Sequence, residues 1–180
     1  GIIYLAEIIT NSQNLIDVNI SYNNFSENFL DLNALDNITN LNNLSLAKSI
    51  GKSSSLQILN LSYNKISQNS IRELCNEIIG NKTENNLCDL FLRNCNINDT
   101  ACKYIGQLFS ANVKIKEINL NENKISHKGI FYISKGIKFN ENLKVIKFEF
   151  NNYIGDLGIL FFTNALKNNN TIENLFLNNL

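Results

Sequence analysis

The feature that most constrains this chain is a frame of apolar residues that returns along most of its length. In the clearest copy, residues 115–125 read IKEINLNENKI, with apolar side chains at Ile115, Ile118, Leu120 and Ile125. The alternation around Ile118 is typical of a short β-strand, whose successive side chains point to opposite faces. Six copies are found, at intervals of 41, 31, 28, 28 and 29 residues. They begin at Leu15, Leu56, Leu87, Ile115, Leu143 and Ile172.

A polar residue or a cysteine follows the strand in five of these copies, three positions after the last inward apolar residue. A sharp turn at that point leaves backbone N–H and C=O groups in need of partners. An amide side chain can bond such groups, whereas a leucine cannot. We therefore predict a structural ladder made of Asn23, Asn64, Cys95, Asn123 and Asn151.

The intervals between the strands carry helical periodicity. After residue 125, Ile130, Ile133 and Ile137 recur on one helical face, with lysines elsewhere. The intervals after the second and third copies repeat this pattern, another helix is expected to run to Leu166, and residues 2–9 are expected to form one as well. A single strand–helix unit cannot bury its apolar face alone, so stacking of the units must supply the core.

The copies match the pattern LxxLxLxxN/CxL, and the chain resembles leucine-rich repeat proteins of the ribonuclease-inhibitor-like class over nearly its whole length. Cys95 supports the match, because cysteine is an accepted alternative at the asparagine position. The resemblance implies an α/β solenoid, a curved horseshoe with parallel strands on the concave face and helices on the convex face. It also implies a single domain over residues 1–180, with about six repeats, that acts as a protein-interaction module or scaffold.

One interval is irregular. Residues 26–55 contain about a dozen residues more than the regular repeat of 28 or 29 allows. We expect helical pieces at residues 28–38 and 41–50, forming an insertion on the outer side, and a degenerate repeat is the alternative. Neither end offers the polar cap that solenoids need, so we expect the chain to be part of a longer protein.

Composition sets the broad class. Hydrophobic residues make up 44% of the 180 residues and charged residues 18%, as in a globular domain. The four cysteines form no CxxC pair, which favours buried free thiols and an intracellular, most simply cytoplasmic, setting. No signal peptide or membrane span is apparent. The net charge is zero, but residues 1–47 carry −5 and residues 111–180 carry +3.

No constellation of residues predicts catalysis. His127 is the only histidine, and it lies near an expected helix start without a nucleophile at a recognised spacing. The glycines form no phosphate-binding loop, and the ligands for a metal cluster are absent. We therefore expect neither an enzyme nor a cofactor. Nucleic acid is not expected as a partner, because glutamates interrupt the basic corner formed by Lys116, Lys144 and Lys147.

The strand residues between the inward positions should face the concave side in lanes that cross the sheet. Apolar and aromatic residues occur there although the core does not need them. Aromatic residues and arginine are the usual anchors of protein interfaces. We predict that a protein or peptide partner contacts Tyr22, Tyr63, Phe91, Arg93, Lys147 and Phe150. The alternative for Tyr22 and Tyr63, which both stand in the triplet SYN, is packing on neighbouring repeats.

Two other functions stay open from the sequence. Leucine-rich repeats of this subclass occur in activators of the nuclear-transport GTPase, so the resemblance also implies a possible GTPase-activating role. The active segment of those proteins has no residue-by-residue match here. The other function is a ligand-sensing array within a larger receptor or scaffold, which flanking domains would reveal.

Overall fold

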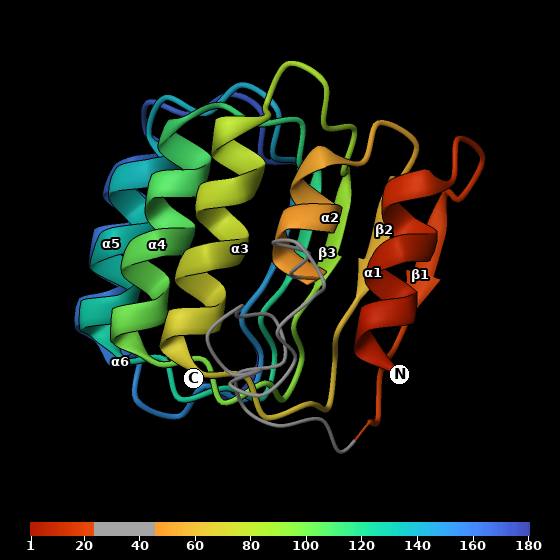
Figure 1. Ribbon diagram of the computed structural model, residues 1–180. Helices are drawn as coiled ribbons and strands as arrows, with labels where there is room; N and C mark the ends of the chain where they lie inside the picture. The colour runs from red at the N-terminus through yellow and green to blue at the C-terminus, as the bar shows by residue number, and fades with distance from the viewer. Residues whose placement is uncertain (24–45) are drawn as a thin grey trace.

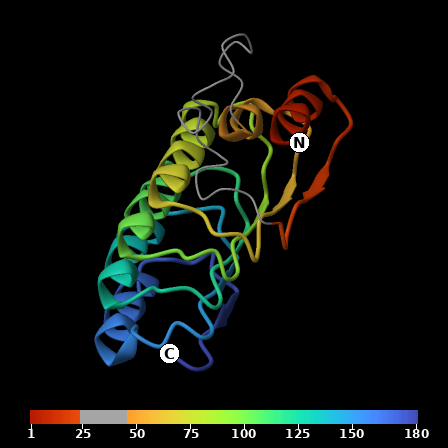
Figure 2. The same cartoon turned by 60° about the horizontal axis from the view of Figure 1, so that its bottom comes forward.

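The computed structural model describes residues 1–23 and 46–180. Within them, six parallel strands form one open sheet in the order β1-β2-β3-β4-β5-β6. The helices stand side by side in a second layer against one face of this sheet (Figure 1). The two layers follow an arc, with the strands on its inner side and the helices on its outer side (Figure 2). The expected α/β solenoid with concave strands and convex helices is confirmed.

Strands and helices alternate strictly along the described chain. Each strand has three residues, and the helices have seven to thirteen. The strands are β1 Asp17–Asn19, β2 Ile58–Asn60, β3 Asp89–Phe91, β4 Glu117–Asn119, β5 Val145–Lys147 and β6 Asn174–Phe176. The helices are α1 Ile2–Asn11, α2 Leu46–Lys52, α3 Gln68–Gly80, α4 Asp99–Ser110, α5 His127–Ile137 and α6 Gly155–Leu166.

The register of the sheet follows the repeat frame without a slip. The central residue of each strand pairs with the central residue of the next, and the side chains of β1 to β5 are buried there. A slip of one residue would turn these side chains to the concave surface, so their burial fixes the pairing. The aligned residues are Val18, Leu59, Leu90, Ile118, Ile146 and Leu175.

The core lies between the sheet and the row of helices. Ile130, Ile133 and Ile137 of α5 face it and are at most 2% exposed, as their spacing predicts. Helices α4 and α5 come close together at Gly106, where an added Cβ would lie 2.4 Å from the carbonyl oxygen of Tyr132. Because this contact is with backbone, which cannot move aside cheaply, the approach of the two helices depends on glycine at this position.

Asn123 bridges two repeats at the bend after β4. Its amide donates to the carbonyl oxygens of Leu92 (2.8 Å) and Leu120 (3.0 Å), one on each side of the repeat boundary. Its Oδ1 accepts from the N–H groups of Cys95 and Ile97, at 2.9 Å each. The amide also donates to the Asn121 carbonyl at 3.1 Å, so one buried side chain bonds five backbone groups at the bend.

The other ladder positions repeat part of this scheme. The amides of Asn64 and Asn151 also donate to a carbonyl of the preceding repeat, at 2.9 Å in both cases. The Cys95 thiol donates in the same direction, to Leu61 at 3.2 Å, and burial raises its pKa to about 12. Asn23 follows the first strand, and among the described residues its exposed amide donates to carbonyls of its own repeat, those of Ile20 and Ser21.

A left-handed backbone, with φ between 51° and 60°, occurs just before each of the five ladder positions and before the equivalent Leu180 of the last repeat. Residues with a Cβ seldom adopt this conformation. The ladder bonds on either side hold the bend in place, so many side-chain types are accepted there. The six residues are Tyr22, Tyr63, Asn94, Glu122, Phe150 and Asn179.

A second set of side-chain bonds lies at the opposite end of the strands, where each helix returns to the sheet. Asn140 is an example: its amide donates to the Phe109 carbonyl of the preceding repeat (2.9 Å), and its Oδ1 accepts from the Leu143 N–H (2.7 Å). Asn85 and Asn169 bond the repeats before them in the same way. Polar side chains thus connect neighbouring repeats at both ends of the strands.

Asp99 connects α4 to the start of α5. Its carboxylate accepts from the N–H groups of Ser126 (2.8 Å) and Gly129 (3.0 Å) and from the Ser126 hydroxyl (2.7 Å). These groups lie at the N-terminus of α5, where unpaired N–H groups and the helix dipole favour a negative charge. His127 is the first residue of α5 and lies half-buried beside this cap.

Two sequence expectations have partial outcomes. The helical piece expected at residues 28–38 lies outside the described residues, and the piece at 41–50 overlaps α2 within them. All four cysteines are free, but only Cys75, Cys95 and Cys102 are buried. The expectation of burial is wrong for Cys88, which is half-buried because it precedes β3 at the sheet surface. Among the described residues, no helix is both long and apolar enough to cross a membrane.

Candidate functional site

The concave face presents a lane of outward side chains from the last residue of each strand. Three are asparagines, Asn19, Asn60 and Asn119, and each accepts a hydrogen bond from the N–H two residues later, at 3.0 to 3.1 Å. Such Asx turns end the strand and occupy the side chain with its own backbone. The remaining repeats carry Phe91, Lys147 and Phe176 at this position.

The neighbouring repeat supplies the bond that Phe91 and Lys147 cannot make. The N–H of Arg93, two residues after Phe91, donates to the Ser62 hydroxyl at 3.3 Å. The N–H of Glu149, two residues after Lys147, donates to Oδ1 of Asn121 at 2.8 Å. Both acceptors belong to the preceding repeat. Phe91 and Lys147 are thereby released from any backbone role, and their side chains project from the strand face.

Three of the predicted residues meet in one row along the edge of the concave face. The rings of Tyr22 and Tyr63 stack with centroids 4.0 Å apart and planes inclined by 12°. The Arg93 guanidinium lies 5.5 Å from the centre of the Tyr63 ring. On its other side, Arg93 forms an ion pair with Glu122, with Nε donating at 3.1 Å. We call Tyr22, Tyr63, Arg93 and Glu122 the edge row.

Hydrogen bonding shifts two pKa values within the edge row. The hydroxyl bond with Tyr22 raises the pKa of Tyr63, and burial adds to the shift. The hydrogen bond with Glu122 raises the pKa of the Arg93 guanidinium. These contacts hold Arg93 in one position as a permanent cation beside the Tyr63 ring.

Lys147 belongs to a second group, near the centre of the strand face. Its Nζ pairs with Oε1 of Glu117 at 2.6 Å and lies 5.3 Å from the centre of the Phe176 ring. Asp89 stands beside Glu117 in the sheet. Burial raises the pKa of Asp89, and the charge of Glu117 raises it further. The face therefore offers acidic and basic groups side by side, together with aromatic surface.

The structure thus divides the six predicted residues among different environments. Tyr22, Tyr63 and Arg93 share the edge row, and Phe91 and Lys147 occupy the strand lane. Phe150 is 47% exposed and makes no ring–ring or cation–ring contact within the described part of the chain. Glu117, Glu122 and Phe176 were absent from the predicted set. Their positions in the lanes were the available signal, but their charge and ring pairings depend on neighbours 29 or 30 positions away.

A polar hollow of about 330 Å³ lies beside the edge row. It shares Glu122 with that row and is otherwise lined by bend residues, namely Lys65, Asn94, Asn96 and Lys124. Over the described ranges, 1–23 and 46–180, no three histidine, cysteine or acidic side chains come together in a way that could hold a metal ion. The concave face thus brings aromatic rings, paired charges and polar groups together on one surface.

Comparison with known proteins agrees with this geometry. A family model described as "Leucine Rich repeat" matches residues 52–75, which span the end of α2, β2 and most of α3. The fold of the chain is that of a leucine-rich repeat solenoid. Its long repeats with α-helices on the outer face agree with the ribonuclease-inhibitor-like subclass. No curated protein matches the chain in sequence.

Two solved leucine-rich repeat structures share the fold of this chain. One is titled leiomodin-1 actin-binding site 2; it has 18% sequence identity and a TM-score of 0.61, and the match covers 96% of this chain and 76% of that one. The other is the tropomodulin C-terminal domain of Caenorhabditis elegans, with 12% identity, a TM-score of 0.58, and coverage of 97% and 80%. Both likenesses concern the fold, because sequence identity is low.

Proposed function

We propose that this leucine-rich repeat chain is a non-catalytic interaction module that binds a protein or an extended peptide on its concave face. The observation that carries the proposal is that Phe91 and Lys147 stand in the strand lane where three other repeats have asparagine. The N–H group that the asparagine would accept from bonds instead to Ser62 or Asn121 of the preceding repeat. The repeat remains structurally intact although the side chains of Phe91 and Lys147 take no part in the backbone bonds, and both stand on the strand face. An arrangement that served stability alone would keep the asparagines.

The size and chemistry of the face support the same function. Six strands spaced by about 4.8 Å span about 24 Å from the first to the last, which suits a protein surface or a peptide segment. Arg93 and the stacked tyrosines supply the residue types that most often dominate binding energy. Paired charges at Lys147 and Glu117 suit a polar rim that selects partners by electrostatic complementarity.

Actin is the first partner to test. The reason is the fold shared with the structure titled as an actin-binding site of leiomodin-1. Co-sedimentation tests binding to filamentous actin, and a titration with labelled actin tests binding to the monomer. Absence of binding in both assays would remove actin as a candidate and leave the concave-face module to be tested with other partners.

The decisive experiment compares two double variants in affinity capture. Phe91→Ala with Arg93→Ala removes an aromatic ring and an arginine from the concave face. Phe139→Ala with Arg72→Ala removes the same two side-chain types from outside this face. We expect the first variant to remain folded and lose the partners identified by mass spectrometry, while the control retains them. Equal recovery by both variants would contradict binding at Phe91 and Arg93.

The GTPase-activating alternative has its own readout. Hydrolysis of GTP by a panel of small GTPases, measured with and without the chain, distinguishes an activator from a binding module. A non-catalytic module leaves every hydrolysis rate unchanged.

We place the module in a reducing compartment, a proposal supported by its four free thiols.

A further inference from the structure

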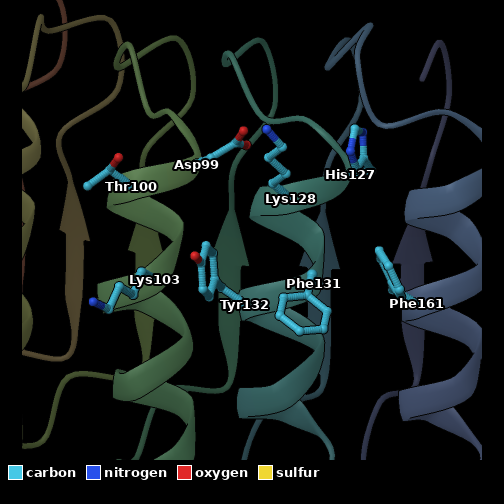
Figure 3. Close-up of a pocket in the computed structure, with 8 residues that line it drawn as sticks. All are labelled: Asp99, Thr100, Lys103, His127, Lys128, Phe131, Tyr132 and Phe161. Atoms are coloured by element: carbon cyan, nitrogen blue, oxygen red, sulfur yellow. The ribbon is translucent and has the colours of Figure 1, made fainter.

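The convex side of the solenoid carries a groove that the proposed concave-face function does not use. It lies across α4, α5 and α6 and encloses about 640 Å³. Tyr132, Phe131 and Phe161 line it, and Figure 3 shows Phe131 and Tyr132 on α5 and Phe161 on the neighbouring α6. The Phe131 ring meets those of Tyr132 and Phe161 edge-on, with centroids 5.8 Å and 5.2 Å apart. A continuous aromatic wall is unusual on a helix surface that faces solvent.

A smaller hollow of about 190 Å³ extends the groove between α5 and α6. It shares Phe131 and Phe161 with the larger one, so the two form a single depression, which we call the convex groove. Ser134 lines the smaller hollow, and its hydroxyl is the only buried side-chain polar atom of the described residues without a hydrogen-bond partner. This hydroxyl lies beneath the surface of the hollow, so it is a cost within the fold and not a contact for an occupant.

The charges around the convex groove are predominantly positive. Four lysines line it, against the single acid Asp99. The Asp99 carboxylate is already engaged in three bonds to the start of α5. These lysines are Lys103, Lys128, Lys135 and Lys138.

Two of these lysines are free to bind an anionic group. The ammonium groups of Lys103 and Lys128 have no hydrogen-bond or ion-pair partner in the described chain. Lys135 lies 4.2 Å from the centre of the Phe131 ring, so a cation also stands directly over the aromatic wall. A ligand that fits must therefore combine negative charge with an apolar side chain.

We propose that the convex groove binds an acidic peptide segment of a partner protein, with an aromatic or aliphatic side chain of the peptide against Phe131 and its carboxylates on Lys103 and Lys128. The hollow shape favours a peptide over a membrane surface, because a flat lipid interface leaves a depression unfilled. The groove is a second interaction surface, independent of the concave face, so one chain can hold two partners on opposite sides.

The test selects binders of the unaltered chain from a display library of short random peptides. The affinity of each selected peptide is then measured for the double variant Lys103→Glu, Lys128→Glu. Lys65→Glu is the control, since Lys65 is an exposed lysine outside the groove. We expect the peptides that bind in the groove to be acidic and to contain an aromatic or aliphatic residue. Their affinity should fall at least about tenfold in the lysine double variant and stay unchanged in the control.

A second pair of variants separates the apolar contact from folding effects. Phe131→Ala should weaken the same peptides, while Phe139→Ala, which removes a ring that is 74% exposed just beyond α5, should not. Thermal melts check that each variant is folded. Failure of the selection to yield any peptide sensitive to the groove variants would overturn the proposal. Binding of equimolar phosphatidylserine–phosphatidylcholine vesicles that depends on Lys103 and Lys128, without such peptides, would replace it with a lipid surface.

Discussion

Asn123→Ala tests how much the ladder contributes to stability. The side chain is 8% exposed and accepts hydrogen bonds from two N–H groups, those of Cys95 and Ile97. Without the amide, both donors stay in the interior with no acceptor, and each such group costs about 1–3 kcal/mol. We expect the free energy of unfolding to fall by about 3–4 kcal/mol, a large part of the total of about 5–15 kcal/mol for a typical domain.

Urea unfolding followed by far-ultraviolet circular dichroism measures this loss. Asn119→Ala is the matched control, because that half-buried amide accepts only one bond within its own repeat, from the Asn121 N–H. The control should lose about 1 kcal/mol or less. Asn123→Cys should lie between the two, since a thiol can donate to the carbonyls as Cys95 does but accepts weakly. A loss for Asn123→Ala no larger than that of the control would refute the reasoning.

Two further predictions concern close packing and buried thiols. Gly106→Ala should lower the unfolding free energy by about 1–3 kcal/mol, because the added methyl group clashes with the α5 backbone. Gly80→Ala is the control: its added methyl group meets no atom within 4 Å and should be neutral or stabilising. Equal thermal melting points for the two variants would contradict this prediction. Burial raises the pKa values of the Cys75 and Cys95 thiols from their ordinary range to about 12. Their stabilising contribution is therefore complete below about pH 9 and declines as pH rises toward 12, by about 1.4 kcal/mol per pH unit for each thiol. Urea midpoints measured at pH 8 and about pH 10.5 check this decline, and a flat profile would exclude it; at pH 8, a thiol reagent should modify half-buried Cys88 first.

The arrangement of the solenoid was predictable because periodic burial specifies it directly. Residues such as Leu59 and Leu90 are apolar at a fixed offset, and only stacked parallel strands bury all of them together. The helical faces followed from the same reasoning, as the burial of Ile130 and Ile133 illustrates. Periodicity also identified the outward lanes, and hence Phe91 and Arg93 as unusual residues within them.

What periodicity could not predict are contacts between side chains of neighbouring repeats. The ion pair of Arg93 with Glu122 and the bond from Arg93 N–H to Ser62 join residues 29 and 31 positions apart, and no local pattern marks either. The second set of polar bonds did leave a signal, since a serine or asparagine such as Asn140 precedes the first apolar residue of most repeats by three positions. The convex groove depends on how α4, α5 and α6 pack and had no signature in the sequence.

The hydrogen bonds that Ser62 and Asn121 accept from the following repeat restrict how such a solenoid can be re-engineered and how its sequence can diverge. A repeat without asparagine in the strand lane needs a hydrogen-bond acceptor from the repeat before it. Such a repeat cannot be moved by itself into another solenoid. Transplanting Phe91 or Lys147 requires the upstream unit as well, and the smallest transferable element is a consecutive pair. Substitutions at Ser62 should accordingly weaken the backbone next to Phe91 and, if the proposed concave-face site is correct, partner binding there. Ser62 and Phe91 should also change together among relatives.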